Sequence, residues 1–300
     1  MSGKPYSSPA AFKAALEDRL RRDSAGGIDI QRRRQIVVFT RMIARTNVAF
    51  DDAMVLKGGF ALEIRLALAR TTRDIDLVLR GSDARLLERL QAAGQLDLKD
   101  FMTFEIQPDK DSPEITGGGT RYGGKRFRAE CKLAGKLYGA RFGLDVVLGG
   151  NMLGEPSSIA TEPFLDFAGI PAPMVQVLPV ETHLAEKLHA YTIPRTTENA
   201  RVRDLPDMAL LGTVKDTPLV PQRLREAFRL TFDARATHKL PTALPAPPTT
   251  WTEPYKALAE AHALPWTSLA QVTGAARAFV DPILSDRDLT VWDPAAWVWR

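Results

Sequence analysis

The sequence has little cysteine and no long apolar run, and both absences exclude classes of protein. Its one cysteine, Cys131, cannot form an intramolecular disulfide framework or a multi-cysteine zinc site. No apolar run approaches the roughly 20 residues of a membrane-spanning helix. The polar N-terminus lacks the apolar core of a signal peptide. We therefore expect a protein of the reducing cytoplasm with no membrane partner.

A strong excess of either charge is also missing. The 300 residues include 40 lysines and arginines and 36 aspartates and glutamates, for a net charge of +4. This excess does not by itself indicate a nucleic-acid partner, because the local distribution of charge matters more. A chain of this length can bury a substantial core, in one large domain or two modest ones. No internal repeat divides it.

The most informative stretch is 55–79, which is typical of a strand, a glycine turn, a helix and a second strand. Asp74 and Asp76 alternate with apolar residues, so both carboxylates point to one face of that strand. Two close carboxylates repel each other and favour a bound cation, for which Mg²⁺ is the default. Gly58 and Gly59 let the backbone approach a ligand and place amide groups at a helix start, where anions are favoured. This layout suits metal-assisted nucleotidyl transfer.

A third acid, Asp145, lies in the apolar run 141–149. Such an acid is costly to bury unless it is paired or bound to metal. We expect Asp145 to face the metal, and the alternative is a solvated position at a strand edge.

Basic and apolar residues alternate between 121 and 137, which predicts a hairpin with one face on the core and one positive face. Two interpretations of that face stay open. It is either an ordinary half-exposed sheet surface or a nucleic-acid contact, which salt-sensitive binding would reveal. The basic residues concerned are Lys125, Arg126, Arg128, Lys132 and Lys136.

The run Lys-Gly-Gly-x-Ala-Leu, followed by Arg-x-Thr-x-Asp-Ile-Asp-Leu, resembles the first motif of the polymerase-β-like nucleotidyltransferases. In this form it is similar to the AbiEii/AbiGii toxin family, which includes the mycobacterial MenT toxins. A second run, Glu-Lys-Leu followed by Arg-Asp-Leu-x-Asp, resembles the downstream half of that signature. The resemblance extends from about Val55 to Asp281.

The resemblance implies an α+β fold in three units. These are N-terminal helices (1–54), a nucleotidyltransferase core with a mixed sheet and flanking helices (55–155), and a mainly helical C-terminal domain that completes the active site (156–300). The proline-rich, loop-like residues 151–179 favour a boundary near there. Ser82 is predicted to cap a helix at 82–91, and the aromatic end, with Trp292, Trp297 and Trp299, to dock onto the body or a partner.

Roles for individual residues also follow from the resemblance. Asp74, Asp76 and Asp145 would hold Mg²⁺. Lys187 matches the lysine that contacts the triphosphate, and Lys57 and Arg65 are further candidates beside the glycine turn.

The downstream run has two candidate acids. Asp207 matches an aspartate required for activity, as a base or as a residue that orients the metal. Pro206 replaces the usual aromatic residue, and the loop between Lys187 and Arg203 is longer than usual, so Asp204 stays a second candidate.

Two further positions have competing interpretations. Thr72 matches a hydroxyl residue that is phosphorylated in some family members, and the alternative is a strand-edge threonine. His183 and His189 lie six residues apart, which does not fit the i, i+4 spacing of helical zinc ligands. We interpret both histidines as structural or surface residues.

The resemblance further implies transfer of a nucleoside monophosphate from an NTP to RNA, at the 3′ end of tRNA, which blocks translation. It implies a cognate antitoxin of the AbiEi or MenA kind as a partner. The alternatives are a nucleotidyltransferase that modifies a protein or small molecule, and a nucleotide-binding pseudoenzyme that acts through a partner.

Overall fold

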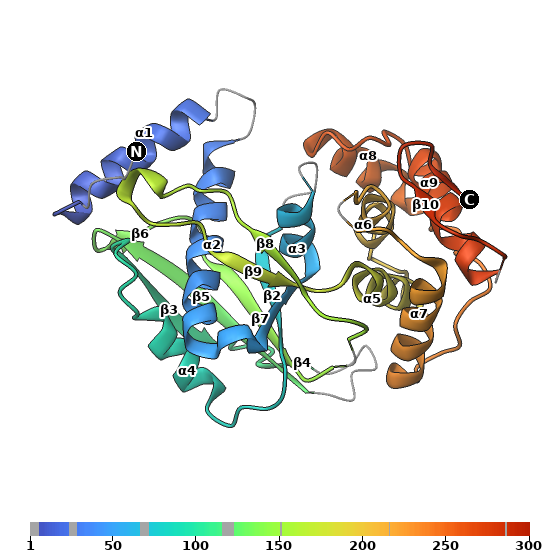
Figure 1. Ribbon diagram of the computed structural model, residues 1–300, viewed down its shortest axis with the longest axis horizontal. Coiled ribbons are helices and arrows are strands. Elements are labelled where there is room, and N and C mark those ends of the chain that lie inside the picture. Colours follow the sequence, from blue (N-terminus) through green and yellow to red (C-terminus); the bar gives the residue numbers. More distant parts are fainter. Residues whose placement is uncertain are drawn as a thin grey trace.

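The computed structural model describes residues 6–23, 29–66, 72–115, 123–150, 152–215, 217–285 and 287–300. The molecule has two parts, which lie next to each other in space (Figure 1). The first is a curved mixed sheet with helices α1 to α4, and the second is a group of helices from α5 onward. No helix among the described residues is long and apolar enough to cross a bilayer. Residues 67–71 of the 55–79 stretch and residues 121–122 of the predicted hairpin lie outside the described residues.

The sheet follows the order β3-β5-β7-β2-β1-β9-β8, with the short β4 and β6 paired to β5. The β2–β7 and β1–β9 pairs are parallel, and the other neighbours are antiparallel. The strands are β1 (Met54–Lys57), β2 (Asp74–Leu79), β3 (Met102–Pro108), β4 (Glu114–Ile115), β5 (Gly124–Leu133), β6 (Lys136–Leu137), β7 (Phe142–Leu148), β8 (Ser157–Ala160) and β9 (Met174–Val177).

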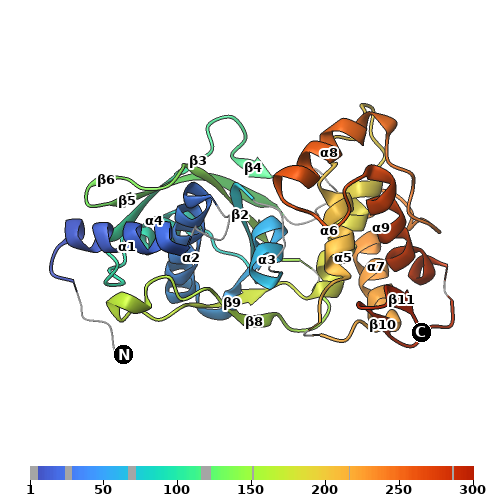
Figure 2. The same ribbon diagram turned by 90° about the horizontal axis from the view of Figure 1, so that it is seen from above.

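Apolar alternation decides which face of this sheet is buried. Ile75 and Leu77 of β2 belong to a hydrophobic core shared with the first helices. Asp74 and Asp76, which alternate with them, therefore lie on the opposite face of the strand. Figure 2 shows α2 and α3 within the curve of the sheet, between its β3–β5 side and its β8–β9 side. The helices of this part are α1 (Pro9–Asp23), α2 (Ile30–Phe50), α3 (Gly58–Arg65) and α4 (Leu86–Gly94).

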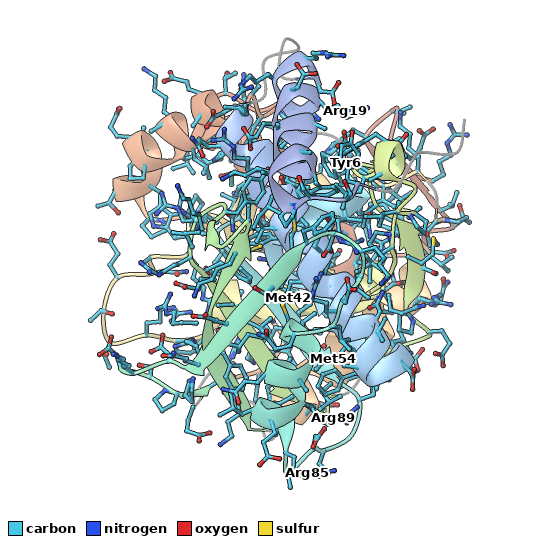
Figure 3. The ribbon with its side chains drawn as sticks, turned by 90° about the vertical axis from the view of Figure 1, so that its left-hand side faces the viewer. Tyr6, Arg19, Met42, Met54, Arg85 and Arg89 are labelled. Atoms are coloured by element: carbon cyan, nitrogen blue, oxygen red, sulfur yellow. The ribbon has the colours of Figure 1, made fainter. Side chains whose placement is uncertain are left out.

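Cation–π contacts fix the outer helices to this core. The Arg19 guanidinium of α1 lies 4.0 Å from the ring centre of Phe167, and that of Arg89 in α4 lies 4.1 Å from Phe50. Figure 3 looks onto this end of the molecule, with Arg19 and Arg89 at opposite ends of the view. Each such contact stabilises a partly exposed helix by about 0.5–1 kcal/mol.

A second hydrophobic core holds the C-terminal helices together. The aromatic end packs into it, because the Trp292 indole donates to the Gly212 carbonyl at 2.7 Å and that of Trp299 to Phe279 at 2.8 Å. The predicted docking onto the body is confirmed. The elements are α5 (Val180–Thr192), α6 (Asp204–Leu211), α7 (Pro221–Arg235), α8 (Thr252–Ala261), α9 (Leu269–Leu284), β10 (Trp292–Asp293) and β11 (Val298–Trp299).

Three sequence-based expectations are wrong in detail. Ser82 does not cap α4, which begins at Leu86; Asp83 instead accepts a bond from the Arg85 amide at 2.9 Å. The glycine pair, expected to form a turn before the helix, is itself the start of α3, which ends at Arg65. The expected loop at 151–179 contains β8 and β9, which extend the sheet. The hydrophobic cores divide after Val177, within the 151–179 segment, and the three-domain division stays a prediction.

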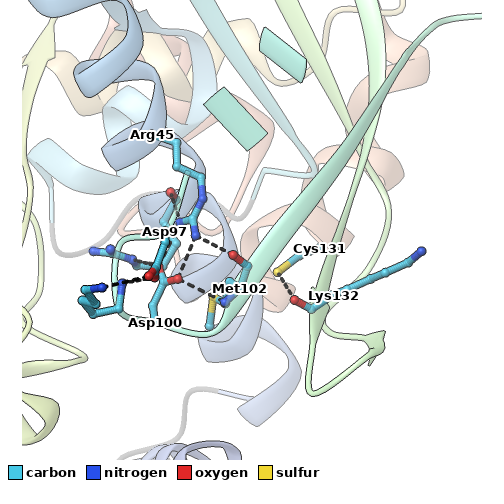
Figure 4. Close-up of polar contacts among 8 residues, drawn as sticks. Arg45, Asp97, Asp100, Met102, Cys131 and Lys132 are labelled. Atoms are coloured by element: carbon cyan, nitrogen blue, oxygen red, sulfur yellow. Dashed lines mark hydrogen bonds and ion pairs between the residues drawn. The ribbon is translucent and has the colours of Figure 1, made fainter. Parts of the chain in front are cut away.

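A buried ion pair anchors α2 to the loop before β3 (Figure 4). Asp100 is fully buried and accepts from Arg45 at 2.7 and 2.8 Å and from Arg41 at 2.6 Å. Burial opposes ionisation of this carboxyl, but the hydrogen bonds and charges of the two arginines outweigh it and hold its pKa below the ordinary value. Asp100 therefore stays charged and holds the loop before β3 against α2.

Removing that carboxylate tests its contribution. Asp100→Ala leaves two buried guanidinium groups without their acid and should lower the free energy of unfolding by about 3–5 kcal/mol. Asp97→Ala, three residues away and 69% exposed, should change it by less than about 0.5 kcal/mol. Urea denaturation measures both, and equal effects would contradict the assigned anchoring role.

Candidate active site

Four charged residues form a row across four neighbouring strands. Backbone pairing sets Lys57 of β1 beside Asp76 of β2, Asp76 beside Asp145 of β7, and Asp145 beside Arg126 of β5. Directly paired residues share one face of a sheet. Two carboxylates therefore adjoin at the centre of the row, with a cation on each side. The Arg126 Nε lies 3.1 and 3.2 Å from the two carboxylate oxygens of Asp145.

The neighbouring cations do not fully offset the negative charges of Asp76 and Asp145. Burial raises the pKa of Asp76 to about 6, and the charges of Asp145 and Asp74 add to this while Lys57 and Lys187 oppose it. Burial also raises the pKa of Asp145, against the opposing charge of Arg126. Both acids are thus held where ionisation costs free energy, and a further cation would relieve that cost.

The donor set fits a magnesium ion that is completed by its substrate. Asp74 lies on the same strand face, and its Oδ1 accepts from the Gly143 amide at 3.0 Å. No group of three or more His, Cys, Asp or Glu side chains placed to hold a metal occurs among the described residues. Mg²⁺ typically takes one or two protein carboxylates and fills its other positions with water and substrate phosphate. Asp76, with Asp74 or Asp145, supplies that number.

The glycine turn lies directly against the acids. Gly58 has φ of +66°, and a Cβ at this position would lie 2.0 Å from Oδ2 of Asp76. Only glycine leaves room there and adopts this conformation without strain. Helix α3 begins at Gly58, so its first amides open beside the carboxylates. This is the arrangement expected of an anion-binding helix start next to a metal.

One face of α5 covers the site from the helical part. His183, Glu186, Lys187 and Ala190 follow the i, i+3, i+4, i+7 spacing and all line the same cleft. Glu186 bridges the two parts, because its Oε2 lies 2.8 Å from Lys57 Nζ and its Oε1 lies 3.1 Å from an Arg235 nitrogen. Burial opposes its ionisation, but Lys57 and Arg235 outweigh that and lower the pKa of Glu186 to about 2.

Lys187 joins both candidate acids of α6. Its Nζ lies 3.0 Å from Asp204 Oδ1 and 2.7 Å from Asp207 Oδ2. Asp207 is fully buried, whereas Asp204 borders both clefts of the site and also pairs with Arg201 at 3.1 Å. Asp207 thus holds Lys187 from its buried side, and Asp204 holds it from the side that lines the clefts.

Two adjoining clefts, of about 290 and 490 Å³, bring most of the predicted site residues together. They share Gly58, Asp76, Lys187, Arg201 and Asp204. The first also contains Lys57 and Asp145, and the second Gly59, Asp74 and Thr72.

Two predicted residues do not line these clefts. One is the buried Asp207. The other is Arg65, whose guanidinium donates to the Leu178 carbonyl at 3.2 Å and so ties α3 to the start of α5.

The structure adds site residues that sequence reasoning missed. Glu186, Arg235 and Arg201 line the first cleft. Glu186 stands next to Lys187 and on the same helix face, which was an available signal. Arg235, which pairs with Glu186, lies far along the chain in α7, and no local pattern points to it.

The predicted hairpin is confirmed, but its positive face is balanced by acids. Four of its five basic residues form ion pairs: Lys125 with Glu114, Arg126 with Asp145, Arg128 with Asp109, and Lys132 with Glu105. Of the two histidines, His189 is buried and bonded to Thr237, while His183 lines the first cleft. Thr72 is mostly buried.

A family model described as "Nucleotidyl transferase AbiEii toxin, Type IV TA system" matches residues 41–294. The chain belongs to this AbiEii family. The protein is therefore a nucleotidyltransferase toxin of a type IV toxin–antitoxin system, and the resemblance seen in its motifs is confirmed. Comparison with curated proteins gives no match.

One solved structure shows the same fold. The nucleotidyltransferase toxin MenT4 of Mycobacterium tuberculosis aligns with a TM-score of 0.61 and 16% identity, over 94% of this chain and 92% of that one. Two Helicobacter pylori proteins, a putative nucleotidyltransferase and JHP933, each align with a TM-score of 0.45 and 16% identity. Both alignments cover 83% of this chain. They cover 94% of the putative nucleotidyltransferase and 92% of JHP933. The expected α+β nucleotidyltransferase fold is confirmed.

The close approach at the glycine turn predicts a site-specific steric effect. An alanine with a positive φ costs at least about 1 kcal/mol of stability. Gly58→Ala should lower the free energy of unfolding by clearly more than this, because its Cβ would also displace Asp76. Gly135→Ala is the matched control, since Gly135 has φ of +72° and open space around its Cβ. Thermal unfolding of the two variants measures the difference. Indistinguishable stabilities would contradict the contact.

The raised pKa of Asp76 predicts a cost to stability that depends on pH. The folded-state pKa of about 6 lies above the ordinary aspartate value of 3.8, so the ionised acid destabilises the fold increasingly as pH rises through this window. Asp76→Asn should raise the free energy of unfolding by about 3 kcal/mol at pH 8 and by about half of that at pH 5. Chemical denaturation without divalent metal measures both values. The exposed control Asp111→Asn should show neither gain, and a loss of stability in Asp76→Asn at pH 8 would refute the assignment.

Proposed function

We propose that this toxin transfers a nucleoside monophosphate from an NTP to the 3′ end of tRNA in an Mg²⁺-dependent reaction, and so blocks translation. The observation that carries the proposal is the row of Asp76 and Asp145 facing the Gly58 helix start, with Lys187 in the same cleft. Bound Mg²⁺ would neutralise phosphate charge and favour ionisation of the acceptor hydroxyl.

The residues of the chain supply position and charge. Asp76, together with Asp74 or Asp145, would hold the metal, and the amides after Gly58 would face the triphosphate. Lys187, fixed by two acids, would neutralise phosphate oxygens as the transferred group moves. Little covalent chemistry is needed from the protein, because phosphoryl-type transfer is driven by positioning and electrostatic stabilisation.

Basic side chains at the second cleft support an RNA acceptor. Arg201 and Arg203 line this cleft, and Arg73 is exposed beside Asp74. Arginines at the mouth of a nucleotidyl-transfer site suit the phosphate backbone of RNA. The balanced hairpin contributes less than its sequence suggested. A cognate antitoxin of the AbiEi or MenA kind and a cytoplasmic location complete the proposal.

Incubating the protein with Mg²⁺, labelled NTPs and total tRNA tests this function. Wild-type protein should label tRNA, and Asp76→Asn should reduce the rate at least about a hundredfold, because it removes a metal-binding charge. Asp111→Asn, an exposed acid outside both clefts, should retain the wild-type rate. Labelling should weaken as salt rises, since phosphate contacts release counterions.

Two experimental results would contradict the proposed transfer to tRNA. Label on a protein or small molecule instead of RNA would support the alternative acceptor classes. Triphosphate binding without transfer to any acceptor would support a pseudoenzyme that acts through a partner. Either result would overturn the tRNA proposal.

A further inference from the structure

His183 is the most deeply placed polar residue on the α5 face that lines the site. Its side chain is only 1% exposed. It lines the 290 Å³ cleft together with Glu186 and Lys187, three and four residues further along the helix. Within the part of the chain that the structure describes, its Nε2 is buried and has no hydrogen-bond partner.

A buried polar atom without a partner is uncommon, because it loses water and gains nothing in return. The other buried ring shows the usual solution, since His189 Nε2 lies 2.8 Å from the Thr237 hydroxyl. His238 follows the same pattern, with its Nε2 2.8 Å from Thr192 Oγ1. His183 is therefore the exception, and its partner is missing from the protein itself.

The surroundings of His183 define the chemistry of that partner. Burial lowers the pKa of its ring to about 3; the charges of Lys187 and Lys57 add to this, and Glu186 and Asp207 oppose it. The ring is therefore neutral at physiological pH and carries one N–H. Lys57 and Lys187 reach into the same cleft, and α3 begins at Gly58 beside them. Both ammonium groups are also paired with acids of α5 and α6, but their remaining donors and the helix start favour an anionic group over a neutral one.

We propose that His183 is a substrate-positioning residue whose Nε2–H donates a hydrogen bond to a phosphate oxygen of the nucleotide's triphosphate tail. This assignment rests on the proposed use of an NTP. Lys57 and Lys187 neutralise the tail, and His183 adds a directional contact that a point charge does not give. The residue thereby favours a triphosphate over a monophosphate, which lacks the distal oxygens.

Equilibrium binding of inorganic triphosphate with Mg²⁺ tests the contact without any transfer reaction. His183→Ala should weaken this binding by about ten- to a hundredfold, the range of a hydrogen bond to a charged group. His183→Gln keeps an N–H donor and should recover part of the loss. Binding of a nucleoside monophosphate should change by less than threefold in both variants. His262→Ala, at the C-terminal cap of α8 and outside both clefts, is the matched control and should match wild type.

A spectroscopic readout separates the contact from a general change in structure. The chain has four histidines, so the ¹⁵N signals of the rings can be assigned by substitution. Adding inorganic triphosphate should shift the His183 Nε2 signal, while the signal of His262 stays in place. Thermal unfolding confirms that each variant is folded before binding is measured.

The outcomes distinguish this inference from the proposed function. Unchanged triphosphate affinity in folded His183→Ala, or no shift of the Nε2 signal, would overturn the inference even if wild-type protein labels tRNA. A loss of affinity in His183→Ala with no nucleotide transfer by the wild type would support the contact and overturn the function. Equal losses for triphosphate and monophosphate would also overturn the inference, because the contact would not lie on the tail.

Discussion

The structure depends on the adjacency of Asp76 and Asp145 on parallel strands β2 and β7. Two carboxylates side by side on a partly buried sheet face are unfavourable, and the pKa values of both are raised. The neighbouring positions in the row, Lys57 and Arg126, offset this only in part. The remaining negative potential suits a divalent cation and its phosphate ligand. The fold thus maintains a cost to stability that substrate binding would remove.

The helical part meets the sheet side of the site through the ion pair of Glu186 with Lys57, and Leu62, Leu66 and Leu153 add apolar contacts with the helical core. Its hydrophobic core is separate from that of the sheet, apart from Leu62 of α3. Glu186 contacts Lys57 from across the site, and Lys187 is fixed by the acids of α6. The sheet therefore contributes the acids, and α5 contributes a cation and a neutral imidazole.

The site acids and the strands that carry them were predictable from local sequence. Alternation in β2 and β7 fixed the faces of Asp74, Asp76 and Asp145, and a glycine pair marked the start of α3. Contacts over long separations were not predictable. Arg235 meets Glu186 only after α7 folds back, and Arg65 turns to the Leu178 carbonyl. The 151–179 segment hid two strands, because their few residues lie between prolines and β9 pairs with the distant β1.

A crystal structure with Mn²⁺ and a non-hydrolysable NTP analogue tests the central claim most directly. The anomalous signal of manganese locates the ion independently of the protein atoms. The account predicts a peak within bonding distance of an Asp76 carboxylate oxygen and of a phosphate oxygen, with the triphosphate against the start of α3. A manganese peak elsewhere, or a triphosphate bound away from Gly58 and Lys187, would contradict it.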